Sequence, residues 1–160
     1  MQTADPLRVR PFRPADAGPA RELFRRSVHE VAVRDYAPDQ LDAWAPREHD
    51  AAAWAASFRP GAAFVAEVGG QFAGFADLSA DDHVGRLYVS PDHQRRGVAQ
   101  ALYMALEAEA RRRGVRRLRV EASDTALGFF HRMGFADAHA QRVERGGVRL
   151  RNYRMQKPLA

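Results

Sequence analysis

The sequence of 160 residues is 46% hydrophobic and 28% charged, which is typical of a globular domain large enough to bury a core. It contains no cysteine, which excludes disulfides and thiolate metal sites, and it has neither an apolar run long enough for a membrane helix nor the apolar N-terminal region of a signal peptide. The six histidines show no close pair with the spacing of metal ligands, and we therefore expect a cytoplasmic protein without a metal.

The charge of the chain is basic. Its 25 basic residues outnumber 20 acidic ones, giving a formal net charge of +5, and all of the basic residues except Lys157 are arginines. This bias reflects either a GC-rich coding sequence or an anionic partner, which would be a nucleic acid or a phosphorylated small molecule. Charge alone does not choose between these readings.

The N-terminal third of the chain predicts one strand and two helices. The strand is expected at 7–12, and apolar residues then recur with helical spacing over 20–31. Pro38 and Pro46 break the chain around a short segment, and 47–58 predicts a second helix. This order begins an α+β arrangement.

The middle of the chain predicts a run of antiparallel strands. Residues 62–68 and 71–78 are apolar and flank Gly69-Gly70, which is a strong hairpin signal. The apolar run 83–89 extends this meander by one more strand.

The last third predicts two helices that alternate with strands. A helix is expected over 97–113 and a short one over 125–133, while 116–123, 135–144 and 148–159 are expected to be strands. The elements form one α+β unit with no linker and no internal repeat.

The corner between the strand 83–89 and the next helix carries two arginines and a glycine. No Asp, Asn or Ser stands before Gly97 to cap the helix, so its first backbone N–H groups are expected to be free. Such groups attract phosphate, to which Arg95 and Arg96 add charge, and small Ala99 leaves the first turn uncrowded. Each charge-assisted bond contributes on the order of 1.5–3 kcal/mol, so several amides could hold a diphosphate. A plain capped turn is the alternative reading.

This corner resembles the acetyl-CoA signature of the GNAT N-acetyltransferase superfamily. Gln94, Gly97 and Ala99 match its pattern Gln/Arg-x-x-Gly-x-Gly/Ala, and "ALGFFHRMGF" at 126–135 is similar to the last helix of the family. The resemblance covers 7–159 and implies a single GNAT domain. The implied fold is α+β, with a mixed, mostly antiparallel seven-stranded sheet that is flanked by about four helices and splayed between the fourth and fifth strands.

The resemblance also implies acetyl-CoA as cosubstrate, with its pantetheine arm lying in the split of the sheet. Backbone groups of Leu87 and Val89 would bind the arm, although apolar strand residues are usually core. The expected coenzyme residues are Leu87, Tyr88, Val89, Gln94, Arg95, Arg96, Gly97, Val98, Ala99, Gln100, Ser123, Phe129, Phe130 and Arg132.

The reaction that the resemblance implies is direct attack of an amine on the acetyl thioester. Keeping an alkyl amine neutral at pH 7 costs about 4.6 kcal/mol, so a base should take its proton. The strand of the family often carries a Glu or His where this chain has His83, and histidine suits the task at neutral pH. Asp81 and Asp82 could tune or replace it, and the alternative reading is a solvated hairpin turn.

The acid of the family is where this sequence departs from the pattern. Many members protonate the leaving thiolate with a Tyr on the last helix, and Phe130 stands at that position, while Ser123 replaces a common Asn. Tyr153 is a candidate acid, although a buried structural tyrosine is the more ordinary reading. The departure puts the acid step in doubt but not coenzyme binding.

The acceptor is expected to be a small-molecule amine or a protein amino group, and not nucleic acid or a membrane. The segments 36–46 and 141–155 resemble YafP-like bacterial acetyltransferases, and His29, Tyr36 and Trp44 are expected to line the acceptor site. Core packing for Trp44 and a solvated helix face for His29 are the alternatives. A homodimer is common in the superfamily.

Two other functions compete with catalysis. The missing tyrosine suggests a non-catalytic acyl-CoA-binding or sensor module. The run "RRRGVRRLR" at 111–119 suggests nucleic-acid binding, but it covers a helix end, where arginines favour the dipole, and it lacks interleaved aromatic residues.

Overall fold

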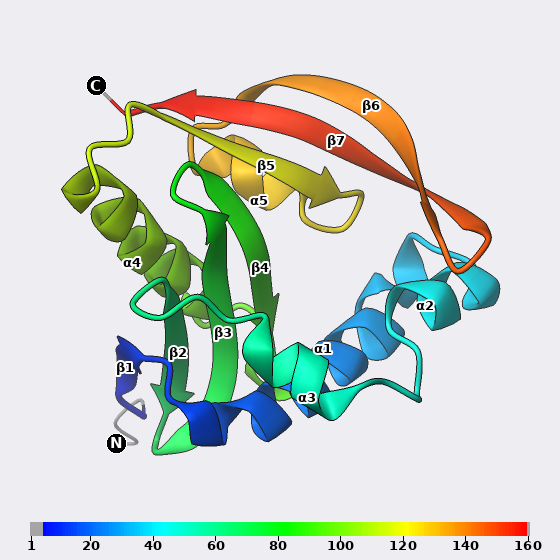
Figure 1. Cartoon of the computed structure of the whole chain (residues 1–160), viewed down its shortest axis with the longest axis horizontal. Helices are drawn as coiled ribbons and strands as arrows, with labels where there is room; N and C mark the ends of the chain where they lie inside the picture. Colours follow the sequence, from blue (N-terminus) through cyan, green and yellow to red (C-terminus); the bar gives the residue numbers. More distant parts are fainter. Residues whose placement is uncertain (1–4, 160) are drawn as a thin grey trace.

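A single seven-stranded sheet organises the chain in the computed structural model, which describes residues 5–159 (Figure 1). The strands are β1 (Leu7–Pro11), β2 (Ala63–Val68), β3 (Gln71–Ala80), β4 (His83–Val89), β5 (Arg117–Ser123), β6 (Ala136–Arg145) and β7 (Val148–Pro158). They lie in the order β1-β2-β3-β4-β5-β7-β6, and only the pair β4–β5 is parallel.

Helices cover both faces of this sheet. The α-helices are α1 (Ala17–Glu30), α2 (Pro38–Trp44), α3 (Ala51–Ala56), α4 (Val98–Arg112) and α5 (Leu127–Arg132), and the 3-10 helices are η1 (Pro14–Asp16), η2 (Ala32–Arg34) and η3 (Pro91–His93). One core cluster joins α4 and α5 to one face of the sheet, and a second joins α1 and α2 to the other face. None of the helices within residues 5–159 is long and apolar enough to cross a bilayer.

The sheet opens between β4 and β5. These two strands are paired only where His83 lies opposite Arg119 and Val84 opposite Val120. Beyond Val84 the strands diverge, while β3 stays paired with β4 and β7 with β5. The predicted α+β fold, with a mixed sheet splayed between its fourth and fifth strands, is thereby confirmed.

Sequence patterns do not predict α2, because Pro38 is expected to break the chain at this point. Pro38 is instead the first residue of α2, where a missing N–H costs nothing and the fixed φ suits a helix. The side chain of Gln40 accepts a hydrogen bond from the N–H of Ala37 at 2.8 Å and completes the start of the helix. A helix at this place carries Trp44 toward the sheet.

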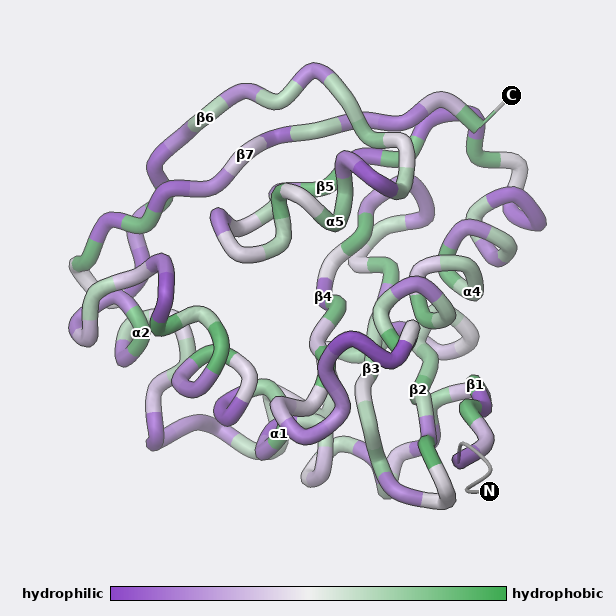
Figure 2. The backbone as a smooth tube through the Cα atoms, turned by 180° about the vertical axis from the view of Figure 1, so that it is seen from behind, coloured by the Kyte–Doolittle hydropathy of each residue, from purple (hydrophilic) through white to green (hydrophobic). Residues whose placement is uncertain are grey.

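The helix predicted over 47–58 is shorter than expected. It begins after Asp50, whose carboxylate accepts from the N–H of Ala53 at 3.0 Å, and it ends at Ala56. The hairpin of β6 and β7 (hereafter the β6–β7 hairpin) also differs from the other strands in composition, because most of its residues are hydrophilic (Figure 2). Leu150 and Met155 are the buried side chains that fix its register on the core.

Candidate active site

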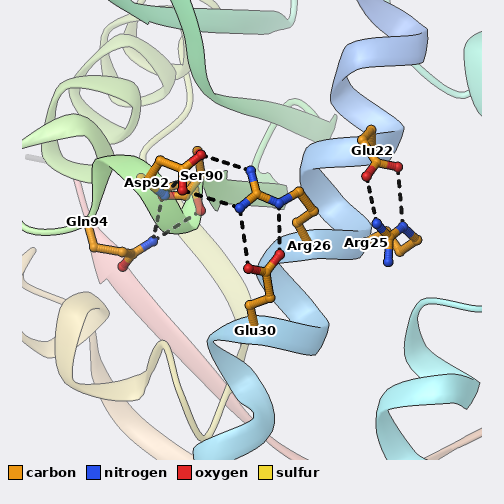
Figure 3. Close-up of polar contacts among 8 residues, drawn as sticks. Glu22, Arg25, Arg26, Glu30, Ser90, Asp92 and Gln94 are labelled. Atoms are coloured by element: carbon orange, nitrogen blue, oxygen red, sulfur yellow. Dashed lines mark hydrogen bonds and ion pairs between the residues drawn. The ribbon is translucent and has the colours of Figure 1, made fainter.

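Contacts from two directions hold the corner between β4 and α4 (Figure 3). Ser90 caps the start of η3 and its hydroxyl accepts from the N–H of Asp92 at 3.2 Å, and the carboxylate of Asp92 pairs with Arg26 of α1 at 3.0 Å. The side-chain amide of Gln94 donates to the carbonyls of Val89 and Ser90 at 3.1 and 3.2 Å. The corner is therefore anchored to α1 and to the end of β4 before the arginines are reached.

The backbone of the corner takes up an unusual conformation. Arg95 has φ 60° and Gly97 has φ 79°, so two left-handed residues alternate with ordinary ones. A non-glycine residue at positive φ is uncommon, and such alternation turns successive N–H groups toward one concave side, which favours an anion. A Cβ at Gly97 would meet no atom within 4 Å, so the conformation and not crowding selects glycine here.

The start of α4 has no internal cap. Gly97 is the N-cap residue without a capping side chain, and the first helical bond runs from the N–H of Ala101 to the carbonyl of Gly97 at 3.0 Å. Within residues 5–159, no hydrogen bond is made by the N–H groups of Val98 or Ala99, nor by the guanidinium group of Arg95. These donors are available to an anionic ligand.

A cavity of about 440 Å³ lies against this corner, and we refer to it as the α4 cavity. Its walls come from the start of α4, the diverging part of β4, and α5. Of the predicted coenzyme residues, all except Arg96 line it, namely Leu87, Tyr88, Val89, Gln94, Arg95, Gly97, Val98, Ala99, Gln100, Ser123, Phe129, Phe130 and Arg132. Arg96 is exposed outside its wall.

A second cavity of about 460 Å³ lies on the other side of β4, under the β6–β7 hairpin, and we refer to it as the hairpin cavity. His83, Tyr36 and Trp44 line it, as expected of base and acceptor residues. The two cavities share part of their walls where β4 and β5 part. The shared residues are Trp44, Leu87, Tyr88, Ser123, Ala126 and Phe130.

His83 is held at both ring nitrogens. Nδ1 is in hydrogen-bonding contact with the hydroxyl of Ser79, and Nε2 with the carboxylate of Glu121 on β5. All three side chains line the hairpin cavity. Glu121 was not singled out from the sequence, because its place beside His83 follows only from the pairing of β4 with β5: Arg119 lies opposite His83, and Glu121, two positions further, shares the same face of the sheet.

The two aspartates next to His83 serve other contacts. Asp81 pairs with Arg59 at 2.7 Å and with Arg113 at 2.9 Å, and these arginines hold the pKa of its carboxyl below the usual value. Asp82 pairs with Arg119 at 3.3 Å. Neither aspartate lines either cavity, so the geometry favours His83 over both as a base.

Tyr36 and Trp44 shape the hairpin cavity with their rings. Their ring centroids are 5.3 Å apart, and the indole N–H of Trp44 donates to the hydroxyl of Tyr88 at 3.2 Å. The hydroxyl of Tyr36 donates to the carbonyl of Arg151 at 2.7 Å and accepts from the N–H of Asp124 at 2.8 Å. Burial raises the pKa of Tyr36 to about 12, so this hydroxyl keeps its proton at neutral pH.

Besides Arg96, two of the predicted residues lie apart from both cavities. The ring of His29 lies with Nε2 2.9 Å from the carbonyl of Ala45, so it links α1 to the end of α2. Tyr153 packs against the core cluster on the α4 face, opposite Ala122 in register. Phe130, by contrast, is 4% exposed and lines both cavities.

A buried ion pair in the hairpin cavity was not foreseen from the sequence. Asp77 is 1% exposed and accepts from the backbone N–H of Arg86 at 2.8 Å and from its Nε at 3.1 Å. The guanidinium group of Arg86 lies 3.8 Å from the ring centroid of Phe58. In the part of the chain that the structure describes, no cluster of three or more His, Asp or Glu side chains could hold a metal ion.

Known proteins share this architecture. Residues 32–157 match the model of a protein family described as an acetyltransferase (GNAT) domain. The chain belongs to this GNAT family. It is 34% identical over 151 residues to the N-acetyltransferase YafP of Escherichia coli (strain K12), covering 93% of this chain and 94% of the relative.

Solved acetyltransferase structures superpose on nearly the whole chain. A GCN5-related N-acetyltransferase from Rhodopseudomonas palustris, also described as a class-II aminotransferase, has a TM-score of 0.90 at 35% identity and covers 99% of both chains. The structure of yncA from Salmonella typhimurium with its cofactor acetyl-CoA has a TM-score of 0.71 at 23% identity, covers 96% of this chain and 94% of that one, and so shows the fold alone. The predicted GNAT fold, the YafP-like subgroup and the activity of an acetyl-CoA-dependent N-acetyltransferase are confirmed.

Proposed function

We propose that residues 7–159 form a single catalytic domain that transfers the acetyl group of acetyl-CoA to the amine of a small molecule by direct attack. One observation carries this proposal. The α4 cavity and the hairpin cavity meet where β4 and β5 part, so a donor and an acceptor bound on opposite sides of β4 would share one wall.

The residues around the α4 cavity fit acetyl-CoA. The uncapped N–H groups of Val98 and Ala99 and the guanidinium group of Arg95 would bind the diphosphate. Leu87 and Val89 lie on the part of β4 that has left β5, so their main chain can bind the amides of pantetheine. Acetyl-CoA, when bound, supplies a thioester that an amine can attack.

We infer that His83 is the base and that Ser79 and Glu121 serve it. The hydroxyl of Ser79 can pass a proton from the incoming ammonium group, directly or through water, to Nδ1 of the ring. The carboxylate of Glu121 would stabilise the imidazolium that forms and keep the ring oriented. The proton thus moves toward the face of the sheet that carries the hairpin cavity.

The shared wall carries the hydroxyls of Tyr88 and Ser123, but no tyrosine stands at the acid position of the family, and the hydroxyl of Tyr88 already accepts from Trp44. Phe130 has no proton to donate, and Tyr153 lines neither cavity. We therefore propose that water protonates the leaving thiolate, and Tyr153 as acid stays a prediction.

A small acceptor fits the hairpin cavity better than a folded protein does. The β6–β7 hairpin is fastened over the cavity by α2 and the segment before it, since Gln40 donates to the carbonyl of Arg149 at 3.0 Å and Tyr36 to that of Arg151 at 2.7 Å. A roof fixed in this way restricts the entrance to molecules that can pass beside it.

The experiment combines calorimetry with acetyl-CoA and thiol release in the presence of a panel of amines. We expect saturable binding of acetyl-CoA and thiol release that depends on the amine. Failure to bind acetyl-CoA would refute the proposal. Tight binding without thiol release for any amine would support the alternative, a non-catalytic acyl-CoA-binding module, which the apolar Phe130 at the acid position favours.

We further propose that the enzyme is bacterial and cytoplasmic, and that it forms a homodimer. The relatives from Escherichia coli and Rhodopseudomonas palustris support the bacterial source, and acetyl-CoA is a cytoplasmic metabolite. Light scattering of the purified chain at several concentrations would measure the mass of the assembly, and a monomer mass throughout would refute the dimer.

A further inference from the structure

Among the charged side chains that line the hairpin cavity, some have a partner of opposite charge and others do not. Its carboxylates are both engaged, Asp77 by Arg86 and Glu121 by His83. Because neither carboxylate is free, the cavity offers no unpaired anion to a second positive charge on the acceptor. A polycationic amine is therefore a poor fit.

Three arginines line the same cavity, and two of them are neutralised. Arg86 donates to Asp77 and also to the hydroxyl of Ser57 at 2.9 Å. Arg151 forms two hydrogen bonds with the carboxylate of Asp124, at 2.9 and 3.1 Å.

Arg145 is the remaining arginine, and within residues 5–159 its guanidinium group makes no hydrogen bond or ion pair. It ends β6, where its partner in register is the apolar Val148, while the neighbouring Glu144 lies opposite Arg149. The hairpin itself therefore leaves the charge of Arg145 unmatched.

The direction of Arg145 follows from the alternation of β6. Val143 and Arg145 both line the hairpin cavity, whereas Arg142 and Glu144 do not, as expected of side chains on opposite faces of a strand. Burial raises the pKa of Tyr88, which lies on the shared wall, to about 12, and the charge of Arg145 opposes this rise. Arg145 thus faces the place where the acceptor amine would react.

We propose that the acceptor carries a carboxylate in addition to its amine, and that Arg145 binds this carboxylate. The inference rests on the proposed function and names the class of acceptor for the same site. A guanidinium group binds a carboxylate through two parallel hydrogen bonds, and one free arginine matches a single negative charge. The apolar side chains of Trp44, Val143 and Leu150 in the same lining suit the carbon body of an amino acid.

The test uses pairs of amines that differ only in the acid group, such as phenylalanine with phenethylamine and leucine with isoamylamine, together with ω-amino acids and an aminophosphonate. We expect kcat/KM at least roughly 10-fold higher for the carboxylate member of the preferred pair, since a charge-assisted bond is worth about that factor or more. Arg145→Ala should lower kcat/KM for that member by roughly 10- to 100-fold. Arg145→Lys should retain part of it, because lysine keeps the charge but not the paired geometry.

Arg142→Ala is the matched control, since Arg142 is exposed on the same strand and lines neither cavity. Equal kcat/KM within every pair, equal effects of the two alanine variants, or preference for the phosphonate would overturn the proposal.

A second measurement separates this proposal from the proposed function. Calorimetry of N-acetyl amino acids with the coenzyme-loaded protein needs no turnover. If no amine is acetylated, the proposed function fails, while binding that Arg145→Ala abolishes and Arg142→Ala keeps would still support the carboxylate site. No binding to the unaltered protein, or equal binding to both variants, would overturn it.

Discussion

At the scale of single residues, the chemistry of this site depends on how the ring of His83 is held. An ionised carboxylate only accepts hydrogen bonds, so the contact with Glu121 places the ring proton on Nε2. Nδ1 is then the basic nitrogen, and it accepts from the hydroxyl of Ser79. The proton of the acceptor must therefore reach the ring from the side of Ser79, which lines the hairpin cavity.

His83→Ala should lower kcat by roughly 100- to 10,000-fold, which is the usual contribution of a general base. The acidic limb of the pH–rate profile should disappear, because no imidazole is left to be protonated. Acetyl-CoA affinity should not change, since His83 lies outside the α4 cavity. Steady-state kinetics between about pH 6 and 9 with calorimetry would measure both.

Asp82→Asn is the control, because Asp82 is next to His83 in the chain, pairs with Arg119 and lines no cavity. It should leave the profile as it is. If the profile of His83→Ala kept its acidic limb, His83 would be cleared of the role and another group would be the base.

The sequence could predict His83 but not the residues that serve it. Its position relative to the corner is a matter of counting along one strand. Glu121 comes from a strand that starts after the whole of α4, and its contact with His83 depends on the parallel pairing of β4 with β5. A role for Arg145 could likewise not be predicted, because only the folded hairpin places this residue at the hairpin cavity.

At the scale of secondary structure elements, the start of α4 is the feature that the neighbouring residues predict best. A glycine without a preceding cap predicts free N–H groups, and the structure shows Gly97 in the left-handed region with no capping side chain. The expectation for α2 failed because a proline both ends and begins helices, and only the contact of Gln40 with Ala37 distinguishes the two cases. The boundary of a short helix is decided by such single contacts.

Gly97→Val should weaken acetyl-CoA binding at least roughly 10-fold. A β-branched residue at φ 79° is strained by about 1–2 kcal/mol, and its side chain would stand in the open space where the diphosphate is proposed to lie. Calorimetric titration of the variant with acetyl-CoA measures the change.

Gly114→Val offers a closely matched control at the other end of α4. Gly114 has φ 81°, and a Cβ there would also meet no atom within 4 Å, so the backbone strain is similar. Gly114 does not line the α4 cavity, which lies at the opposite end of the helix. Both variants should lose similar stability, but only Gly97→Val should lose coenzyme affinity. Equal affinities would remove the diphosphate from this corner.

At the scale of the whole molecule, the active site is a consequence of two cores on opposite faces of one sheet. The core on the α4 face supports the α4 cavity, and the core that includes α1 and α2 supports the floor of the hairpin cavity. The β6–β7 hairpin starts beside α5 and its tip lies near α2, so it ties the two halves together above the split (Figure 1). Composition and periodicity could not predict this closure, because the hairpin is mostly hydrophilic and its place is set by the pairing of β7 with β5 and by contacts with α2.

The hydroxyl of Tyr36 helps to hold the hairpin over the cavity, because it joins the segment before α2 to β7 and to the loop after β5. Tyr36→Phe should therefore destabilise the protein by roughly 1–3 kcal/mol, since two buried hydrogen bonds are lost. It should also raise the KM of the acceptor several-fold, because the hydroxyl no longer holds β7 over the hairpin cavity, while the Kd of acetyl-CoA stays constant, since Tyr36 does not line the α4 cavity. Urea unfolding and steady-state kinetics measure the two effects.

Tyr153→Phe is the control, as Tyr153 lies on β7 but lines neither cavity. It should match the unaltered protein in stability and in the KM of the acceptor. A loss of kcat in Tyr153→Phe at full stability would instead identify Tyr153 as the acid, and an unchanged acceptor KM in Tyr36→Phe would show that the roof does not hold the acceptor.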